Sequence, residues 1–283
     1  MSDPEPNFSD KLEEILKRIR KATSHKSIRL TNRGNSAIFA ALSIAKRVNS
    51  RPYILIPDQG GWLSYRKYPQ YFNFAVKEVQ TEYGVIDIEQ LEEHTKTASA
   101  LIINSFAGYF AEQPLKAIAK ICHKNGCMLI EDATSAFGDK NLCNGKYSDI
   151  IVGSFGQGSS VNFKYGGFLS TAKPEHADAS RDALSLVKVH ESFYREILPY
   201  LNNKRLLKIL FAADSLKKQL EAFEVLHRGR RGLDVVVKFS PDIVSFCQQK
   251  KLPYTLCPDY NRVNEKALCI EVKDLPFEET RKE

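Results

Sequence analysis

Three short segments of this chain carry residue types that could hold a phosphorylated ligand and act on it. Gly34 to Ser36 opens an Ala-rich helical run. A helix N-terminus offers free N–H groups and the positive end of a dipole, which suits a phosphate. Asp132 follows the apolar run 127–130, and Ser154 closes another apolar run before a serine- and glycine-rich stretch. The sequence therefore predicts a phosphate site with a carboxylate beside it.

Each segment also has an ordinary structural explanation. Gly34 to Ser36 fits a helix cap, and Asp132 fits a turn residue after a buried strand. As a functional group, Asp132 would pair with a pyridinium nitrogen and keep that ring an electron sink. The Ser154 hydroxyl would bind the phosphate, and Gly166-Gly167 would permit a close backbone approach. The order of the segments, each at the end of a strand, favours the functional interpretation.

Short, fully apolar strands alternate with helices over the first part of the chain. We expect strands at 28–30, 53–56, 74–79, 98–103, 127–130 and 150–152, and helices at 8–22, 37–48, 61–68, 87–94 and 113–124. Such strands form a mostly parallel sheet covered on both faces, which binds ligands at the carboxyl ends of its strands. The sequence therefore predicts an α/β fold.

The pattern changes beyond residue 172. Residues 173–224 are helical and charged, and strands at 234–238, 254–257 and 267–272 surround a helix at 241–251. We predict a large α/β domain over residues 1–172. Residues 173–283 would form a helical connection and a reduced C-terminal α+β domain.

Together these segments resemble the DegT/DnrJ/EryC1/StrS family of fold-type-I pyridoxal phosphate (PLP) enzymes, many of which aminate nucleotide-linked sugars. The resemblance covers roughly residues 25–172, and Leu256 to Tyr260 and Ile270 to Lys273 look like the family's small domain. It implies the central sheet of a PLP-dependent transferase. It also implies PLP or its amine form, PMP, as cofactor, a small-molecule substrate, most commonly a nucleotide sugar, and a homodimer.

The resemblance also assigns residues. Trp62 is the candidate for the aromatic that stacks on the ring, the alternative being a core tryptophan. Ser135 stands where the family usually has a glutamine near the ring hydroxyl. Asn162 and Tyr165 lie where a neighbouring subunit would be contacted. The positions that match cofactor-binding positions of the family are Gly34, Asn35, Ser36, Trp62, Asp132, Ser135 and Ser154.

The main departure from the family lies at Ser159. This residue stands five positions past Ser154, where the family has its Schiff-base lysine. A hydroxyl cannot form an imine, and serine is a poor base without a partner. Lys164 is nearby, but it precedes Gly166 by two residues, and its amine would approach the ring from the wrong direction.

Three interpretations of Ser159 remain open. The protein could bind PLP or PMP noncovalently and still do chemistry. It could be a transaminase whose lysine comes from elsewhere, or one in which Ser159 is a drifted or engineered change. It could also be a non-catalytic descendant that serves as a binding or partner subunit. The best statement of function is a PLP-dependent aminotransferase-like protein, with the noncatalytic or PMP-using homologue as the alternative.

The net charge of +7 fits either an anionic ligand or a solvated basic surface. The densest basic patch, His227 to Arg231, lacks interleaved aromatics, so nucleic-acid binding is not expected, although the patch could contact a nucleotide-linked substrate.

No apolar run is long enough to span a membrane, and the N-terminus has no apolar signal core, so we expect a cytoplasmic protein. The six cysteines form no CxxC pair and no zinc spacing, so no metal site is expected.

Overall fold

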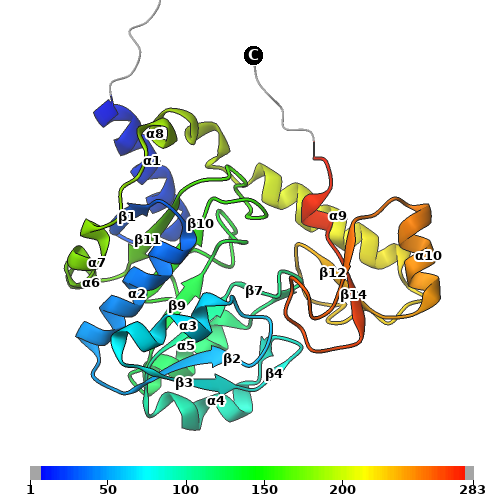
Figure 1. The fold of residues 1–283 in the computed structure, drawn as a ribbon, viewed down its shortest axis with the longest axis horizontal. Coiled ribbons are helices and arrows are strands. Elements are labelled where there is room, and N and C mark those ends of the chain that lie inside the picture. The colour runs from blue at the N-terminus through cyan, green and yellow to red at the C-terminus, as the bar shows by residue number, and fades with distance from the viewer. Residues whose placement is uncertain (1–7, 278–283) are drawn as a thin grey trace, which may run out of the picture.

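The computed structural model describes residues 8–277, and its larger part is built on one seven-stranded sheet (Figure 1). The strand order is β1-β11-β10-β9-β6-β2-β3. From β10 to β3 neighbouring strands run parallel, whereas β11 is antiparallel to both β10 and β1. In chain order the strands are β1 (Ser27–Thr31), β2 (Tyr53–Pro57), β3 (Ala75–Val79), β6 (Ala98–Asn104), β9 (Met128–Asp132), β10 (Ile150–Ser154) and β11 (Gly167–Thr171).

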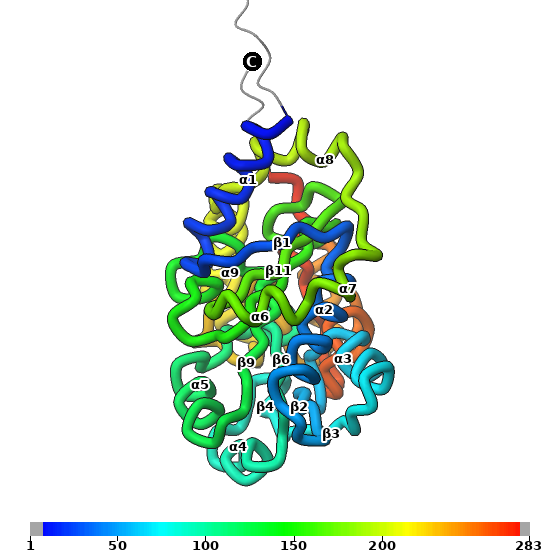
Figure 2. Tube along the Cα trace, turned by 90° about the vertical axis from the view of Figure 1, so that its left-hand side faces the viewer, coloured from blue at the N-terminus to red at the C-terminus, as the bar shows by residue number. Residues whose placement is uncertain are grey.

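Helices cover both faces of this sheet. Successive side chains of a strand point to opposite faces, and the central strands are apolar on both. Ile54 and Ile56 pack with α2 (Gly34–Val48). Leu55, between them, joins the core cluster that includes side chains of α1 (Phe8–Thr23), α4 (Ile88–Thr95) and α5 (Leu115–Lys124). Figure 2 shows α2 and α5 on opposite sides of the sheet.

The C-terminal part is a smaller α+β unit. Its antiparallel sheet has the order β12-β14-β13. The long helix α9 (Lys204–Gln219) leads into it, and α10 lies at its outer side (Figure 1). The elements of this unit are β12 (Val235–Lys238), α10 (Pro241–Gln249), β13 (Tyr254–Leu256), β14 (Ala267–Ile270) and η3 (Val272–Asp274).

Short elements connect these parts. Two small hairpins project from the carboxyl ends of the strands, and a series of short helices precedes α9. These elements are α3 (Ser64–Lys67), η1 (Pro69–Phe72), β4 (Thr81–Glu82), β5 (Val85–Ile86), β7 (Phe106–Ala107), β8 (Ala111–Glu112), α6 (Pro174–Ala179), α7 (Arg181–Ser185), α8 (Glu191–Glu196) and η2 (Leu198–Tyr200).

The predicted fold class is confirmed, since the central sheet is mostly parallel and a small α+β unit follows it. Several element bounds differ from expectation. The helix predicted at 61–68 is the four-residue α3, because Gly61 to Leu63 are not helical. The helix predicted from 37 already begins at Gly34, and the one predicted from 113 begins at Leu115, after Pro114. The division into domains at residues 172 and 173 stays a prediction.

Two absences apply to the described range alone. No helix within residues 8–277 is long and apolar enough to cross a membrane. Over the same residues, no group of three or more His, Cys, Asp or Glu side chains is arranged to hold a metal ion.

Candidate active site

The predicted site residues from three segments converge at the carboxyl edge of the sheet. Asp132 ends β9, Ser154 ends β10 and Gly34 begins α2. A Cβ atom added to Gly34 would lie 2.7 Å from the Ser154 Cβ, so the close approach of α2 to β10 requires glycine. Thr134 bridges two of them: its Oγ1 donates to Asp132 Oδ1 at 2.6 Å and accepts from the Ser154 N–H at 3.0 Å.

Both carboxylate oxygens of Asp132 have donors from the chain itself. Oδ2 accepts from the Tyr65 hydroxyl at 2.8 Å, and Oδ1 accepts from the Thr134 backbone N–H at 3.0 Å as well as from its hydroxyl. Asp132 is 4% exposed and Tyr65 is 1% exposed. Burial raises the pKa of Asp132, and the bonds from Thr134 and Tyr65 partly offset that rise.

The start of α2 is held by its own neighbours. Ser36 Oγ donates to Asn32 Oδ1 at 2.7 Å, and the Trp62 indole N–H donates to Asn35 Oδ1 at 2.9 Å. No side chain caps the helix at Arg33. The Ser154 hydroxyl accepts from the Gly156 N–H at 3.0 Å. The hydrogen bond between Trp62 and Asn35 places Trp62 beside the start of α2, so two of the predicted cofactor-binding residues lie next to each other.

A loop of the C-terminal unit, residues 257–264, closes over Trp62. The Arg262 guanidinium carbon lies 5.1 Å from the Trp62 ring centroid and 6.0 Å from that of Tyr109. Arg262 Nε donates to the Gly61 carbonyl, and the Gly60 N–H donates back to the Arg262 carbonyl at 2.9 Å. The loop is therefore hydrogen-bonded to the segment that carries Trp62.

Ser159 is a buried turn residue. Ser159 is only 1% exposed, and its hydroxyl accepts a hydrogen bond from the Asn162 N–H at 2.8 Å. Lys164 is exposed and left-handed, with φ 73°. The Tyr165 hydroxyl accepts from the His190 N–H at 3.1 Å, and Ser135 is 1% exposed. The loop thus places Ser159 inside and Lys164 outside.

Comparison with known families decides the affiliation. A sequence model of the DegT/DnrJ/EryC1/StrS aminotransferase family matches residues 9–233. The chain belongs to this family. A second model, described as the MJ1341 family C-terminal domain, matches residues 203–283. No protein with curated annotation matches the chain.

Solved structures of PLP enzymes share the fold of this family member. Serine palmitoyltransferase from S. paucimobilis with a bound PLP–myriocin aldimine superposes with a TM-score of 0.71 at 15% identity, covering 92% of this chain and 71% of that one. Ureidoglycine–glyoxylate aminotransferase from Bacillus subtilis gives 0.66 at 14% identity, covering 95% and 82%. Mouse CSAD in its apo form gives 0.66 at 16%, covering 95% and 72%. At these identities the likeness shows the fold alone.

Membership of the DegT/DnrJ/EryC1/StrS family implies PLP, and the Asp132 carboxylate fits its ring nitrogen. Oδ2 accepts one side-chain hydrogen bond, from Tyr65, and a carboxylate oxygen can accept two, as Oδ1 does from Thr134. One face of the Trp62 ring is covered by Arg262, which leaves the other. The residue that does not fit an imine-bound cofactor is Ser159, at the predicted Schiff-base position, which has no amine and whose hydroxyl is engaged within its own loop.

Sequence reasoning missed three residues of this site: Tyr65, Thr134 and Arg262. Thr134 could have been found, because it stands two residues after the strand-end carboxylate, the spacing at which an aspartate often bonds the backbone. Tyr65 follows Trp62 by three residues, a spacing that aligns side chains on a helical turn. Nothing in the sequence indicates that Arg262 reaches Trp62.

The basic patch His227 to Arg231 contacts other parts of the chain. Arg228 donates to the carbonyls of Lys217, Leu220 and Phe223. The His227 ring lies 2.7 Å from the Glu82 carbonyl oxygen. These bonds give the basic side chains of the patch a structural role within the chain. The predicted contact of the patch with a nucleotide-linked substrate stays a prediction.

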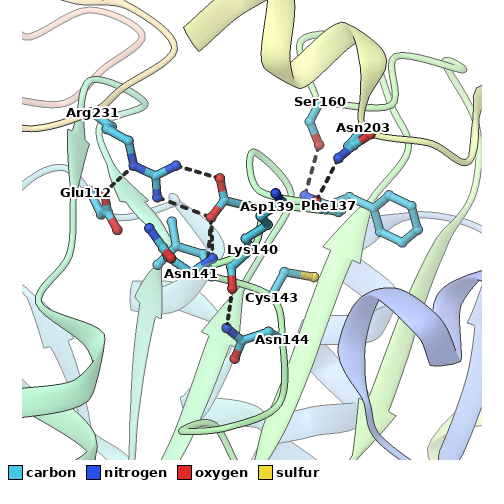
Figure 3. Close-up of polar contacts among 12 residues, drawn as sticks. Glu112, Phe137, Asp139, Lys140, Asn141, Cys143, Asn144, Ser160, Asn203 and Arg231 are labelled. Carbon is cyan, nitrogen blue, oxygen red and sulfur yellow. Dashed lines mark hydrogen bonds and ion pairs between the residues drawn. The ribbon is translucent and has the colours of Figure 1, made fainter.

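Arg231 forms the most extensive polar junction of the patch (Figure 3). Its Nε donates to Glu112 at 2.6 Å, and its two terminal nitrogens bind the two Asp139 oxygens at 2.8 and 3.1 Å. Glu112 and Asp139 raise the pKa of Arg231, so it stays charged. Figure 3 also shows Ser160 accepting from the Phe137 N–H, at 3.1 Å. The junction therefore joins the start of the C-terminal unit to the loop after β9.

Proposed function

We propose that this chain is a non-catalytic member of its family, which keeps the fold and acts as a binding or partner subunit. The observation that carries the proposal is that residue 159, at the predicted Schiff-base position, is a buried serine without an amine. The Asp132 carboxylate does not decide the matter, because Oδ2 could accept a ring N–H beside the bond from Tyr65.

The environment of Ser159 supports the same proposal. We propose that Ser159 stands at the Schiff-base position of the family. Transamination needs an amine at that place to hold the cofactor and move a proton. The Ser159 hydroxyl has neither property, and it already accepts a backbone bond from Asn162.

The alternatives remain predictions with less support. An active transaminase on a nucleotide sugar requires a lysine from elsewhere, and Lys164 is exposed. A noncovalent PLP or PMP enzyme requires a proton-transfer group other than Ser159. The homodimer, the small-molecule substrate and the cytoplasmic location are likewise family-based or composition-based expectations.

An absorption spectrum tests the proposal directly. The purified chain is incubated with PLP, freed of excess cofactor and measured with and without borohydride reduction. We expect no retained cofactor. A chromophore that borohydride fixes to a lysine, located by peptide mass spectrometry, would overturn the proposal. Retained cofactor that borohydride leaves unfixed would overturn it too, in favour of a noncovalent site.

A designed reversal sharpens this test. Ser159→Lys combined with Tyr65→Ala supplies an amine and removes the phenol from Asp132. We expect this double variant to retain more PLP than the wild type and to be fixed by borohydride. Ser159→Met with Tyr65→Ala is the matched control, because methionine has a similar length but no amine. Equal retention by both variants would mean that any cofactor binds outside this site.

A further inference from the structure

A basic groove lies between α5 and the loop that follows β9, and α5 is on the side of the sheet opposite α2 (Figure 2). The groove has a volume of about 830 Å³. One wall is α5 with the residues just before it, and the other is the loop 140–147. None of the predicted cofactor-binding residues lines it, so the groove is separate from the candidate active site. Each wall contributes two lysines, which are Lys116, Lys120, Lys140 and Lys146.

These four exposed lysines have no acidic partner within residues 8–277. No carboxylate in that range lies within ion-pair distance of any of their amines. Lys124, at the end of the same helix, is by contrast paired with Glu92 at 2.5 Å. Among the lining residues, all within 112–147, only Glu112 carries a carboxylate, and it is bound to Arg231. The groove therefore carries positive charge that the described part of the chain does not compensate.

The helix α5 places its two groove lysines at unfavourable positions. Lys116 lies in the first turn, at the positive end of the helix dipole, and no acidic residue stands in that turn. Lys120 follows four residues later on the same face, and like charges at this spacing repel each other. An anionic group bound in the groove would relieve both effects.

The loop that forms the second wall is held in place by the chain itself. Asp139 Oδ1 accepts from the N–H groups of Asn141 and Leu142 at 2.8 and 3.0 Å. The Asn144 side chain donates to the Lys140 carbonyl at 2.8 Å (Figure 3). The groove is therefore formed before any partner arrives, and little ordering of the loop opposes binding. Its apolar lining residues are Pro114, Leu115, Ala117, Ala119, Leu142 and Tyr147.

We propose that this groove binds an acidic amphipathic segment of a partner protein. The carboxylates of that segment would lie against the four lysines, and its apolar side chains would cover the apolar lining. Complementary charge across an interface guides association and selects the partner.

Two other occupants fit the groove less well. The lining, all of it within residues 112–147, has no arginine, and apart from His123 its only aromatic ring is Tyr147. A nucleic acid would find few surfaces on which its bases could stack. A second copy of this chain is disfavoured by charge, because the chain carries a net charge of +7.

This inference rests on the proposed function, because the role of a partner subunit is what calls for such a surface. The two can fail separately. Retention of PLP reports on the site of Ser159, whereas peptide binding reports on the groove. Absence of PLP together with absence of peptide binding would overturn this inference alone. Retained PLP together with peptide binding would overturn the proposed function alone.

Fluorescence anisotropy of a labelled synthetic peptide measures binding to the purified chain. The probe is an amphipathic helical peptide with glutamate on one face and leucine on the other. One control peptide has glutamine in place of every glutamate, and a second has serine in place of every leucine. We expect saturable binding of the probe that weakens as the salt concentration rises. Both control peptides should bind about tenfold more weakly or worse.

Variants assign the binding to the groove. Lys120→Glu combined with Lys140→Glu reverses one charge on each wall and should weaken binding of the probe about tenfold or more. Lys188→Glu combined with Lys250→Glu is the matched control, because it changes the net charge equally at exposed lysines outside the groove. Circular dichroism and thermal unfolding first establish that each variant is folded. If the groove double variant unfolds, Lys120→Glu alone carries the test.

Amide hydrogen exchange locates the bound peptide. The probe should slow exchange in residues 112–123 and 140–147 of the wild type and should leave the rest of the chain largely unchanged.

Four results would overturn the inference. The first is the lack of saturable binding of the probe, and the second is equal binding of the glutamine peptide. The third is an equal loss of affinity in the two double variants, which would mean that only the overall charge matters. The fourth is tighter binding of a single-stranded RNA oligonucleotide than of the probe, lost in the groove variant, which would make the groove a nucleic-acid site.

Discussion

Two buried oxygen atoms 2.8 Å apart, in Tyr65 and Asp132, set the properties of the candidate site. Tyr65→Phe removes the hydroxyl that donates to Asp132 Oδ2, and the buried Oδ2 atom loses this hydrogen bond. We expect a loss of about 1–3 kcal/mol in the free energy of unfolding, measured by chemical denaturation. Tyr68→Phe is the control, because the Tyr68 ring packs against Phe39 and its hydroxyl forms no hydrogen bond within residues 8–277.

The loss in Tyr65→Phe should depend on pH. Burial raises the pKa of Asp132 above its ordinary value, and the Tyr65 bond lowers it. Because the pKa of Asp132 is higher in the folded than in the unfolded chain, protonation of Asp132 favours the folded state. Its contribution to the free energy of unfolding is complete in acid and is lost as the pH rises through the folded pKa. Without Tyr65 the pKa rises further. The deficit of the variant should therefore be larger at neutral pH than at about pH 4, and an equal deficit at both would contradict this account.

Lys273 and Asp234 form a buried ion pair with its own test. The Lys273 Nζ lies 2.7 Å from Asp234 Oδ2, and both side chains are at most 1% exposed. Burial lowers the pKa of Lys273, but the Asp234 carboxylate outweighs burial, so the pKa is raised and Lys273 stays charged. Lys273→Met should cost about 3–5 kcal/mol, because it leaves the buried carboxylate without its cation and with only the backbone N–H of residue 273 as donor. Adding Asp234→Asn should recover part of that loss in thermal unfolding. An additive double variant would mean that the two groups act independently.

Residues at strand ends were predictable from the sequence, but their partners were not. The apolar runs before Asp132 and Ser154 indicate buried strands, and parallel strands bring their carboxyl ends together. That reasoning correctly joins Asp132, Ser154 and Gly34. It says nothing of which side chains fill the space above them. Tyr65 and Arg262 reach Asp132 and Trp62 through tertiary packing, which leaves no local pattern.

At the scale of elements, α5 and the entry to β10 are joined by a titratable pair. The His123 Nε2 lies 3.1 Å from Asp149 Oδ2, and this contact raises the pKa of His123. Because the pKa of His123 is higher in the folded than in the unfolded chain, protonation of His123 stabilises the fold. This contribution is complete below the unfolded pKa and is lost as the pH rises through the folded pKa. The pair is half-exposed, so its contribution should be well under about 1 kcal/mol.

A proton NMR titration checks this pair. The His123 pKa should lie above the value of a model histidine and should fall in Asp149→Asn. The Asp149 carboxylate also accepts from the Leu129 N–H at 2.8 Å, and asparagine keeps an acceptor oxygen there. A His123 pKa that Asp149→Asn leaves unmoved would contradict the assignment.

Elements themselves were predicted best where burial is complete. The fully apolar runs that became β2, β6 and β9 needed no tertiary information, because each must be covered on both faces. The predicted extent of α3 was wrong at its start, because the pattern over residues 61–68 does not show that Gly61 to Leu63 lie outside the helix. The loop 257–264 was taken only as family-like, and its closure over Trp62 depends on contacts some 200 residues apart along the chain.

At the scale of the whole molecule, the two parts meet around Gly232. The Leu233 N–H donates to the Tyr109 carbonyl at 2.7 Å, and Glu112 N–H donates to the Arg231 carbonyl at 2.8 Å. This places the chain directly against the β7–β8 hairpin. A Cβ atom at Gly232 would lie 2.0 Å from the Phe110 carbonyl oxygen. The atoms nearest to that Cβ position all belong to the Phe110 backbone, so no flexible side chain could move aside.

Gly232→Ala should therefore weaken the junction between the two parts. We expect a loss above about 2 kcal/mol in the free energy of unfolding, because the alanine methyl forces two backbone segments apart. Gly229→Ala is the matched control three residues earlier, where a Cβ atom meets nothing within 4 Å, and it should change stability by at most about 0.5 kcal/mol. Thermal unfolding and limited proteolysis compare the two. The loop 257–264 belongs to the unit that this junction attaches, so Gly232→Ala should also increase the exposure of Trp62 to a quencher such as acrylamide. Equal stability and equal quenching in both variants would mean that the C-terminal unit is not anchored at this point.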